Sequence, residues 1–313
     1  MALNNITIFP KNKKGVFFTL LTISLLSLFL ISYSIYSTVQ NQESISKRIK
    51  TMNNFVFLVE EDLPRQLYIS GFRIIFLMEN EISNKGSYIS DVNSSFQEGF
   101  YNGTISGIPN EIMNDVTFQG IIIKLNEKAS KINVNVNLSN PIITITQKDP
   151  WNINLNFSTN LIITDNEDLA NWNKIYTQEI NIPIKGFADP LYVVNTNNLI
   201  SNLINQTPYT TFVSGTDVTN LTNHLNNQYY KASTSAPSFI DRLEGKTTPN
   251  INGIESLVYI PGLPSFAIKS KSVVDYIYFS TSNPATDTIQ YMPSWFKLDD
   301  EHQDDYQVEG LVT

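Results

Sequence analysis

The strongest pattern along the chain is an apolar segment from Val16 to Ile35 that contains no charged side chain, and no charge follows until Glu43. About 20 helical residues, each rising about 1.5 Å, match the ~30 Å hydrocarbon core of a bilayer. The serine and threonine hydroxyls of the segment can bond back to helix carbonyls. We therefore predict a transmembrane helix over residues 16–39 rather than a buried helix of a soluble core.

Beyond this segment the apolar positions recur with a period of about 3.5, which predicts a helix with one apolar face over residues 40–86. Pro64 lacks a backbone donor and can kink this helix. Because slightly fewer than three heptads are present, packing against the protein's own sheet is favoured over a coiled coil. The apolar positions are Ile45, Ile49, Met52, Val56, Val59 and Leu63.

Alternating apolar and polar residues predict an antiparallel sheet with one packed and one wet face. This alternation occurs in residues 132–138, 151–163 and 180–184, mostly with asparagine at the polar positions. The sequence Asp165-Asn166-Glu167-Asp168 supplies a turn. Pro183 is expected at a sheet edge or near a strand end.

The segments around this sheet have weaker patterns. Residues 87–110 are predicted to be a turn-rich link with one short helix, and a further helix is predicted from Asn110 to about Ser130. In the C-terminal part we expect helices near residues 217–229 and 237–243, and strands near residues 257–260 and 273–279.

The fold class predicted from these elements is α+β: an N-terminal transmembrane helix, extended by an amphipathic helix, packs on an antiparallel meander sheet. Whether the C-terminal portion is a separate domain is left open. The predicted organisation is a cytoplasmic basic leader over residues 1–15, the span over 16–39, the amphipathic helix over 40–86, a helix-plus-sheet domain over 87–196, and a mixed portion with an acidic tail over 197–313.

Composition narrows the function. The net charge of -8 and the pI of about 4.8 argue against a nucleic-acid partner. The absence of cysteine excludes disulfides, zinc–thiolate sites and cysteine nucleophiles, and only 2 histidines are present. Much of the negative charge lies between Asp299 and Glu309. This segment lacks the spacing of a calcium loop, so we interpret it as a solvated acidic strip.

Basic residues set the expected orientation of the span. Lys11, Lys13 and Lys14 precede it, and the next basic residues are Lys47 and Arg48. The positive-inside rule then keeps the N-terminus cytoplasmic and places residues 41–313 outside the cell membrane. The region after the span offers no small-x-small site for cleavage of an ordinary secretory peptide.

The order of residues at the start of the span carries a resemblance. Lys13-Lys14-Gly15 directly precedes Val16-Phe17-Phe18, so the glycine comes before the apolar segment. This order resembles the class III signal of type IV pilins and archaeal pilin-like proteins, which implies cutting after Gly15, with Lys14, Gly15 and Val16 as the processing residues. The fifth residue after the glycine is Leu20, where bacterial pilins usually carry Glu, so filament assembly is in more doubt than membrane insertion. An uncut signal anchor is the alternative.

A second resemblance extends over most of the chain. It rests on four short motifs in this order: Tyr68-Ile69-Ser70-Gly71-Phe72-Arg73, Asp149-Pro150-Trp151, Trp172, and Asp189-Pro190-Leu191-Tyr192. Behind a class III-like segment, they are similar to uncharacterised membrane-anchored proteins of archaea with small genomes. The resemblance implies an archaeal surface protein and no particular mechanism.

Candidate chemistry is sparse. Ser265 lies in Gly-Leu-Pro-Ser-Phe, which is not the nucleophile elbow of hydrolases. His224 and His302 are each interpreted as solvated, so we predict no enzyme, no metal site and no cofactor. Trp151, Trp172 and Trp295 are candidates for a glycan-binding platform, because aromatic faces and amides bind sugars together; ordinary half-buried sheet aromatics are the alternative.

Two functions remain. One is a single-span cell-surface structural or adhesion protein, pilin-like at its N-terminus, whose partners are the lipid bilayer and copies of itself or other pilin-like subunits through Val16 to Ile35. The other is a membrane-anchored extracytoplasmic domain that binds a ligand or glycan and does not polymerise. The state of the apolar helix separates them: a filament subunit buries it against neighbouring copies, whereas an anchor leaves it in lipid.

Overall fold

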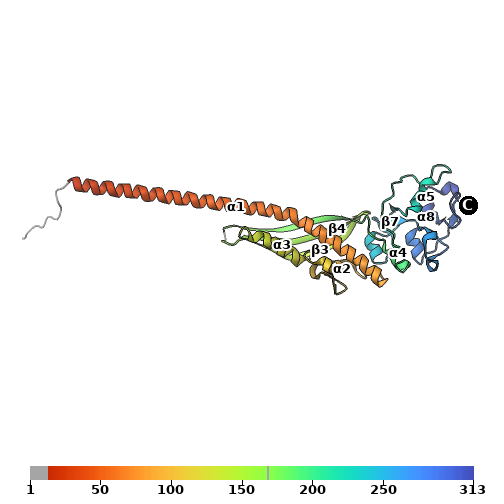
Figure 1. Ribbon diagram of the computed structural model, residues 1–313. Helices are drawn as coiled ribbons and strands as arrows, with labels where there is room; N and C mark the ends of the chain where they lie inside the picture. Colours follow the sequence, from red (N-terminus) through yellow and green to blue (C-terminus); the bar gives the residue numbers. More distant parts are fainter. Residues whose placement is uncertain (1–12, 168) are drawn as a thin grey trace, which may run out of the picture.

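The computed structural model describes residues 13–167 and 169–313 and confirms the α+β class (Figure 1). A single helix, α1 (Lys13–Lys85, 73 residues), continues through Pro64 without ending. The predicted span and the predicted amphipathic helix are therefore parts of one helix in two environments. Residues 15–51 contain no buried side chain, whereas Met52 and the apolar positions that follow it at helical spacing are buried.

Hydroxyl side chains in the apolar part of α1 bond to the helix backbone, as the sequence predicts. The Oγ1 of Thr22 donates to the Phe18 carbonyl at 2.8 Å, and the Oγ of Ser27 donates to the Ile23 carbonyl at 2.7 Å. Thr38 donates to Ser34 in the same way at 2.8 Å. These bonds satisfy the polar groups within the helix, so the segment presents an apolar surface.

The central sheet consists of β3 (Val134–Asp149), β4 (Asn152–Asp165) and β5 (Asn171–Pro183), paired antiparallel in the order β3-β4-β5. This is the meander predicted from the alternation, with longer strands than expected. Pro183 is the last residue of β5, and β5 is an edge strand. Pro183 therefore lies both at a sheet edge and at a strand end, the two positions expected for it. Along β4 the residues Ile153, Leu155, Phe157, Leu161 and Ile163 are buried, and the intervening Asn156, Ser158 and Asn160 are half-buried.

Helix α1 packs on this sheet most closely at Gly71. A Cβ atom at Gly71 would lie 2.6 Å from the Ile182 Cδ1 atom and 2.7 Å from the Leu155 Cδ1 atom, so only glycine permits this approach without movement of the sheet side chains. The same face of the sheet is covered by α2 (Val92–Asn102) and α3 (Phe118–Ser130), whose Phe100 and Phe118 pack against Phe157 of β4. The buried part of α1 thus packs against the sheet, the arrangement that the sequence favours over a coiled coil.

The helix expected from Asn110 to Ser130 is wrong in its first half. The segment begins with the short helix η1 (Glu111–Met113), and Asp115 then adopts a positive φ of 67°, which ends any helical path. Helix α3 starts afresh at Phe118, because the Thr117 hydroxyl accepts a hydrogen bond from the Gly120 amide at 3.1 Å and caps it.

We call residues 52–183 the sheet unit and residues 188–313 the distal unit, because the latter lies beyond the sheet at the end farthest from the start of α1 (Figure 1). The distal unit has a second apolar core around Tyr278, Phe296 and Tyr306. Part of residues 197–313, including Ile204 and Phe239, contributes to the core of the sheet unit instead.

The remaining elements are short. In the sheet unit they are β1 (Thr104–Ile105) and β2 (Ile108–Pro109). In the distal unit they are α4 (Pro190–Asn195), α5 (Thr219–Asn226), β6 (Tyr230–Ala232), α6 (Phe239–Leu243), β7 (Ile254–Ser256), η2 (Ile260–Gly262), η3 (Ser265–Ala267), α7 (Asp275–Phe279), β8 (Asp287–Thr288), β9 (Lys297–Leu298), α8 (Asp300–Asp305) and η4 (Glu309–Leu311).

The strand predictions in the distal unit are corrected. Residues 257–260 do not form the expected strand: β7 ends at Ser256, and Leu257 makes an isolated bridge to Val274. The strand expected at residues 273–279 is the helix α7, in which the Tyr278 amide donates to the Val274 carbonyl at 2.7 Å. All five residues of α7 are buried, so this short apolar segment has no exposed face from which its period can be read.

Candidate functional site

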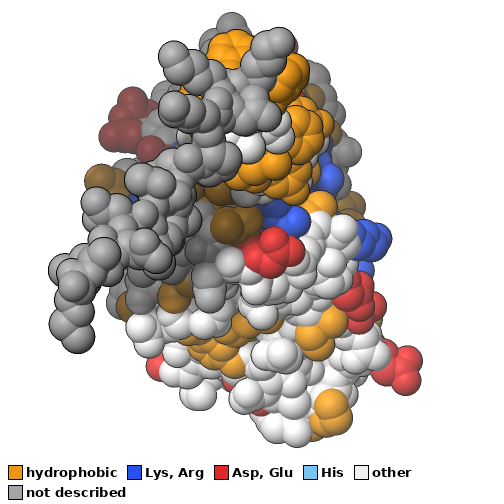
Figure 2. Space-filling view, turned by 90° about the vertical axis from the view of Figure 1, so that its left-hand side faces the viewer, with side chains coloured by type: hydrophobic (Ala, Val, Ile, Leu, Met, Phe, Trp, Pro, Cys, Tyr) orange, Lys and Arg blue, Asp and Glu red, His pale blue; other side chains and the backbone are white. Residues whose placement is uncertain are grey.

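The exposed arm, residues 15–51 of α1, is the first candidate. Its most apolar stretch has a mean hydropathy of 2.2 and no buried residue, and α1 is long and apolar enough to cross a membrane. Figure 2 views the molecule from the left-hand side of Figure 1: apolar side chains gather in the upper part of the view, above a surface made mostly of uncharged groups. Lys14, Gly15 and Val16, which the sequence predicts to be processing residues, lie in the first turn of α1.

The arm joins the sheet unit through Arg48. Its guanidinium Nη2 lies 2.6 Å from the Asp165 carboxylate at the end of β4 and donates to the Asn133 carbonyl at 3.3 Å. The carboxylate of Asp165 also accepts from the Glu167 and Leu169 amides in the turn that leads to β5. The turn predicted at residues 165–168 thus also anchors the helix, although Asp168 lies outside the described residues.

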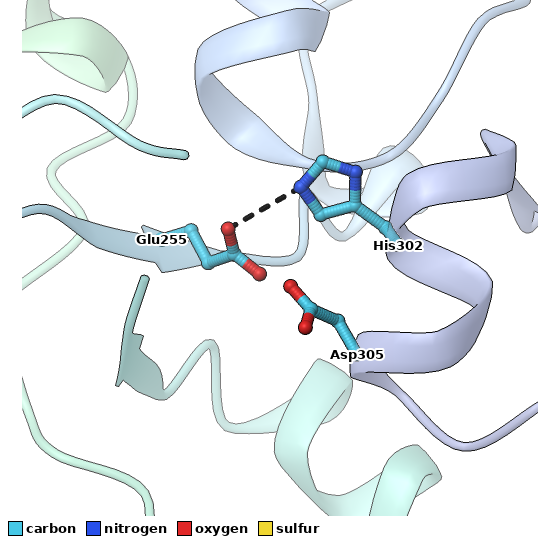
Figure 3. A group of neighbouring side chains, drawn as sticks. All are labelled: Glu255, His302 and Asp305. Carbon is cyan, nitrogen blue, oxygen red and sulfur yellow. Dashed lines mark ion pairs between the residues drawn. The ribbon is translucent and has the colours of Figure 1, made fainter. Parts of the chain in front are cut away.

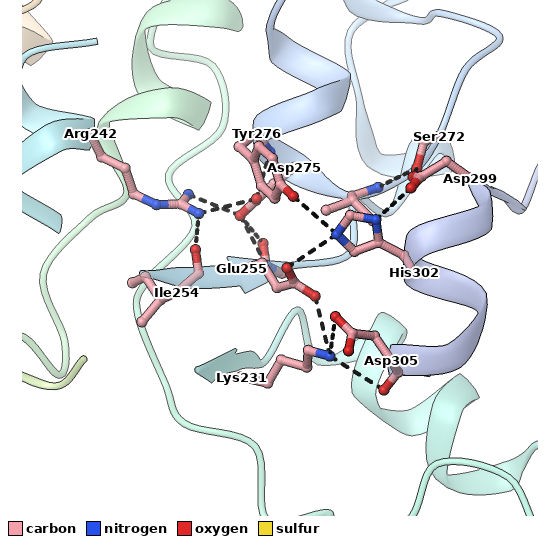
Figure 4. A network of polar contacts seen from close by, with 12 residues as sticks. Lys231, Arg242, Ile254, Glu255, Ser272, Asp275, Tyr276, Asp299, His302 and Asp305 are labelled. Atoms are coloured by element: carbon pink, nitrogen blue, oxygen red, sulfur yellow. Dashed lines mark hydrogen bonds and ion pairs between the residues drawn. The ribbon is translucent and has the colours of Figure 1, made fainter. Parts of the chain in front are cut away.

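The second candidate is a buried ionic network in the distal unit (Figure 4). Arg242 of α6 is fully buried, and its Nη1 atom lies 2.6 Å from Asp189 Oδ2 and 2.9 Å from Asp275 Oδ2. Its Nη2 atom donates to the Ile254 carbonyl of β7. Burial raises the pKa of Asp275 to about 6, although Arg242 opposes this shift. One guanidinium therefore ties together the starts of α4 and α7, helix α6 and strand β7.

A neighbouring part of the network is centred on His302 of α8. The imidazole Nδ1 lies 2.6 Å from Asp299 Oδ1, and Nε2 lies 3.1 Å from the Tyr276 hydroxyl and 3.4 Å from Glu255 Oε2. Burial lowers the pKa of His302, but the bonds to Asp299 and Glu255 outweigh it and raise that pKa to about 10. His302 is consequently an imidazolium at neutral pH, held between two carboxylates.

Three side chains of this region, Glu255, His302 and Asp305, lie close enough together to share a metal ion (Figure 3). Figure 4 shows that Lys231 also points into the group. Its Nζ atom lies 3.4 Å from Glu255 Oε1 and 3.2 Å from Asp305 Oδ2. Because two cationic side chains already neutralise these carboxylates, and protonated His302 cannot ligate, the arrangement fits an ion-pair network and not a metal site.

The same network lacks the geometry of a hydrolase. Ser272 Oγ donates to Asp299 Oδ2 at 2.6 Å, so the serine and histidine both bond to the aspartate and no base faces the hydroxyl. Ser272, Asp299 and His302 are also buried. Among the described residues, Ser265 makes no hydrogen bond to either histidine.

Both histidines were expected to be solvated, and both expectations are wrong. His224 of α5 is fully buried, its Nδ1 lies 3.1 Å from Thr207 Oγ1, and burial lowers its pKa to about 4. The acidic segment is likewise not a fully solvated strip, because Asp299 and His302 are buried while Asp300 and Glu301 stay exposed. Buried and exposed residues follow one another within one turn at the start of α8, so composition alone does not show which of them are solvated.

The three tryptophans do not form one platform. Trp151 precedes β4 and packs against the core of the sheet unit. Trp172 of β5 pairs with Ile163 towards the opposite end of the sheet, and Trp295 contacts Tyr259 in the distal unit. A glycan contact at a single tryptophan stays a prediction.

Sequence reasoning missed the ionic network, yet a signal for it exists. Glu255 follows Gly253-Ile254 and precedes Ser256-Leu257-Val258, and Asp275 stands between Val273-Val274 and Tyr276-Ile277. A lone carboxylate inside an apolar segment is costly to bury unless it is paired, so such residues predict buried cations elsewhere in the chain.

In comparisons with known proteins, no model of a protein family, no curated protein and no solved structure matches the chain.

Proposed function

We propose that this protein is a single-span cell-surface protein of structural or adhesive function, pilin-like at its N-terminus, that carries an exported α+β domain. The observation that carries the proposal is the continuity of α1, which is apolar and exposed over residues 15–35 and packs on an antiparallel sheet from Met52 onwards. One rigid helix thereby links the segment suited to lipid with the folded units.

The proposed orientation follows from charge. Lys11, Lys13 and Lys14 precede the span, and the first basic residue after it is Lys47. The positive-inside rule places the leader in the cytoplasm and both units outside. Protease added to intact cells should then remove the distal unit and leave the span protected. Protection of Thr313 until the cells are lysed would reverse the orientation.

The helix sets how far the protein reaches. From Ile35 to Arg48, where the sheet unit begins to contact α1, the rise is about 20 Å, and from Ile35 to Lys85 it is about 75 Å. The distal unit is accordingly held far from the bilayer, which is the placement that a surface adhesin or receptor needs.

Contact between copies is proposed along α1. Apolar side chains remain exposed on this helix beyond the reach of lipid, with exposed fractions of 60% for Phe57 and 58% for Leu58. A neighbouring copy would cover Val16 to Ile35 and these residues together. In an archaeal cell, processing between Gly15 and Val16 would release such a subunit from its leader.

The absence of cysteine makes the assembly directly testable. Single cysteines placed at Ser24 and Leu58 should give disulfide-linked dimers on oxidation in native membranes, and a cysteine at Ser158 on the wet face of β4 serves as the control. Monomer-sized particles after solubilisation, with no cross-link at Ser24 or Leu58, would favour the non-polymerising receptor instead.

Processing has its own test. Mass spectrometry of the protein from its native membrane should find Val16 at the N-terminus, because the glycine offers no side chain to obstruct a peptidase at the membrane boundary. Gly15→Leu should block this cut. An intact Met1 or Ala2 terminus would reduce the N-terminal segment to a plain signal anchor.

A specific observation favours the second candidate function, a membrane-anchored ligand-binding domain. A cavity of about 570 Å³ opens between α1 and the segment that leads to the distal unit, which is a volume suited to a small molecule.

A further inference from the structure

The cavity lies where α1, η1 and two segments of the chain before and after α4 meet. Phe72 and Phe76 of α1 line one side, Phe187 lies 5.1 Å from Phe72 between ring centres, and Leu203 closes the opposite side. The phenylalanines at 72 and 76 remain about 40% exposed, although they lie one helical turn apart on the same face of a well-packed helix. The lining is therefore mostly apolar and aromatic, as in sites for small organic ligands.

Two cations stand in this lining without a carboxylate partner. Within the described part of the chain, neither Arg73 nor Lys185 makes an ion pair. Arg73 is held in place by one bond, from its Nη1 to the Ile112 carbonyl at 2.7 Å. Other basic residues of α1, such as Arg48 and Lys85, have acidic partners. The cavity thus offers unneutralised positive charge beside apolar surface.

Glu79 is the one acidic group in the lining. Burial raises its pKa to about 9, with a further rise from nearby Asp189, so at neutral pH the carboxyl is protonated and adds no negative charge. The Ala188 backbone hydrogen-bonds to this carboxyl group and partly opposes the rise in its pKa, whereas the Oε1 atom is buried without a hydrogen-bond partner in the protein. Buried polar atoms are nearly always hydrogen-bonded, so this oxygen indicates a polar group supplied from outside.

From this juxtaposition we propose that the cavity binds a small amphiphilic carboxylate, with its apolar body against Phe72, Phe76 and Phe187 and its carboxylate between Arg73 and Lys185. A polar atom of the ligand body bonds to Glu79. Phe72 lies about 55 Å along α1 from Ile35, so the ligand comes from solution and not from the bilayer that holds the span. The proposed ligand site does not depend on whether copies of the chain assemble.

The charge preference is tested with three probes that share one apolar body: 2-naphthylacetate, 2-naphthylethanol and 2-naphthylethylamine. Binding to the full chain in lipid nanodiscs is measured by calorimetry, and empty nanodiscs give the value to subtract. The carboxylate should bind at least about tenfold more tightly than the amine, because only the carboxylate pairs with the two cations. Equal binding of the carboxylate and the amine, or no binding of the carboxylate beyond the empty nanodiscs, would overturn the proposal.

Variants then locate the site. Arg73→Gln combined with Lys185→Gln should weaken 2-naphthylacetate about tenfold, while Arg65→Gln, two turns earlier on α1, leaves binding unchanged. Ser201→Trp fills the cavity from an exposed position and should abolish binding without disturbing a core. If both the double variant and Ser201→Trp bind the probe as the unaltered chain does, the ligand lies elsewhere and the assignment fails. Neither result bears on the cross-linking of α1.

Discussion

The sheet unit and the distal unit bury their chains in different ways. In the sheet unit, strands of 13 to 16 residues and long helices pair their own backbone groups. Helix α1 covers the sheet with apolar side chains such as Leu63 and Leu67, which are both fully buried. In the distal unit the longest described helix, α5, has 8 residues. There, fully buried Arg242 bonds to Asp275 and to the Ile254 carbonyl. Fully buried Glu255 pairs with Lys231 and His302.

The difference teaches where buried charge is useful. Regular elements satisfy backbone donors and acceptors internally, so their contacts can be wholly apolar. Short elements and loops leave such groups unpaired, and a guanidinium with several donors fixes their relative positions, as Arg242 does with the Ile254 carbonyl. A counterpart in the sheet unit, the buried Asp165 paired with Arg48 of the arm, lies at a loop as well.

The largest effect should come from breaking the network at its centre. Arg242→Met leaves Asp189 and Asp275 buried without their cation, which should lower the free energy of unfolding of the distal unit by about 3–5 kcal/mol. With Trp151 and Trp172 changed to phenylalanine, Trp295 fluorescence reports on this unit alone during urea unfolding.

The matched control for that variant is Arg65→Met, at an arginine whose side chain is 74% exposed. Adding Asp189→Asn and Asp275→Asn to Arg242→Met should restore part of the loss, because the unpaired charges are then removed. An unchanged midpoint for Arg242→Met alone would mean that the network contributes nothing to the distal unit.

In the sheet unit, shortening one buried apolar side chain should lower the free energy of unfolding by a comparable amount. Leu63→Ala creates a cavity between α1 and the sheet and should cost about 3 kcal/mol. The loss should be the same at pH 5 and pH 8, because no titrating group is removed. It is measured by urea unfolding with Trp151 as the reporter, and Leu58→Ala on the exposed side of α1 is the control. A loss that changes with pH would contradict the apolar description of this core.

The pH dependence of the distal unit should be visible through His302. Its folded pKa of about 10 lies above its ordinary value of 6.5, so its stabilising contribution is complete below pH 6.5 and disappears as the pH rises through 10. His302→Gln should therefore lower the unfolding free energy by about 2 kcal/mol at pH 6. The deficit relative to the unaltered chain should shrink towards pH 10.5, and a deficit that is constant across this range would count against the imidazolium.

An effect of the opposite sign, a gain of stability on substitution, is expected at the boundary of the two units, where Glu79 is held protonated. Its pKa rises from an ordinary 4.5 to about 9 on folding, so stability falls as the pH increases between these values. Glu79→Gln cannot ionise and should raise the unfolding free energy at pH 8, with little effect at pH 4. Thermal unfolding at the two pH values measures this. Destabilisation at pH 8 would indicate that the carboxyl is ionised and paired.

Most of the sheet unit and the arm could be predicted from the sequence. A segment of apolar residues without charge and a period of 3.5 both describe one helix, and the two-residue alternation of strands such as Ile153 to Phe157 describes a half-exposed sheet. These patterns are local, because each element has one face in solvent or lipid and one face in a core. The helix predicted from Asn110 is wrong in its first half, because the positive φ of Asp115 ends the helical path and Thr117 caps a new helix.

The distal unit and the two candidate sites needed the tertiary structure. Asp189, Arg242, Glu255, Asp275 and His302 are spread over more than 100 residues, and no spacing along the chain connects them. The sequence by itself determined which side chains are apolar, charged or able to span a bilayer. Only the fold decided which charges lose their water, and hence which must pair, because the energy of a charge depends on the solvent and partners around it and not on its neighbours in sequence.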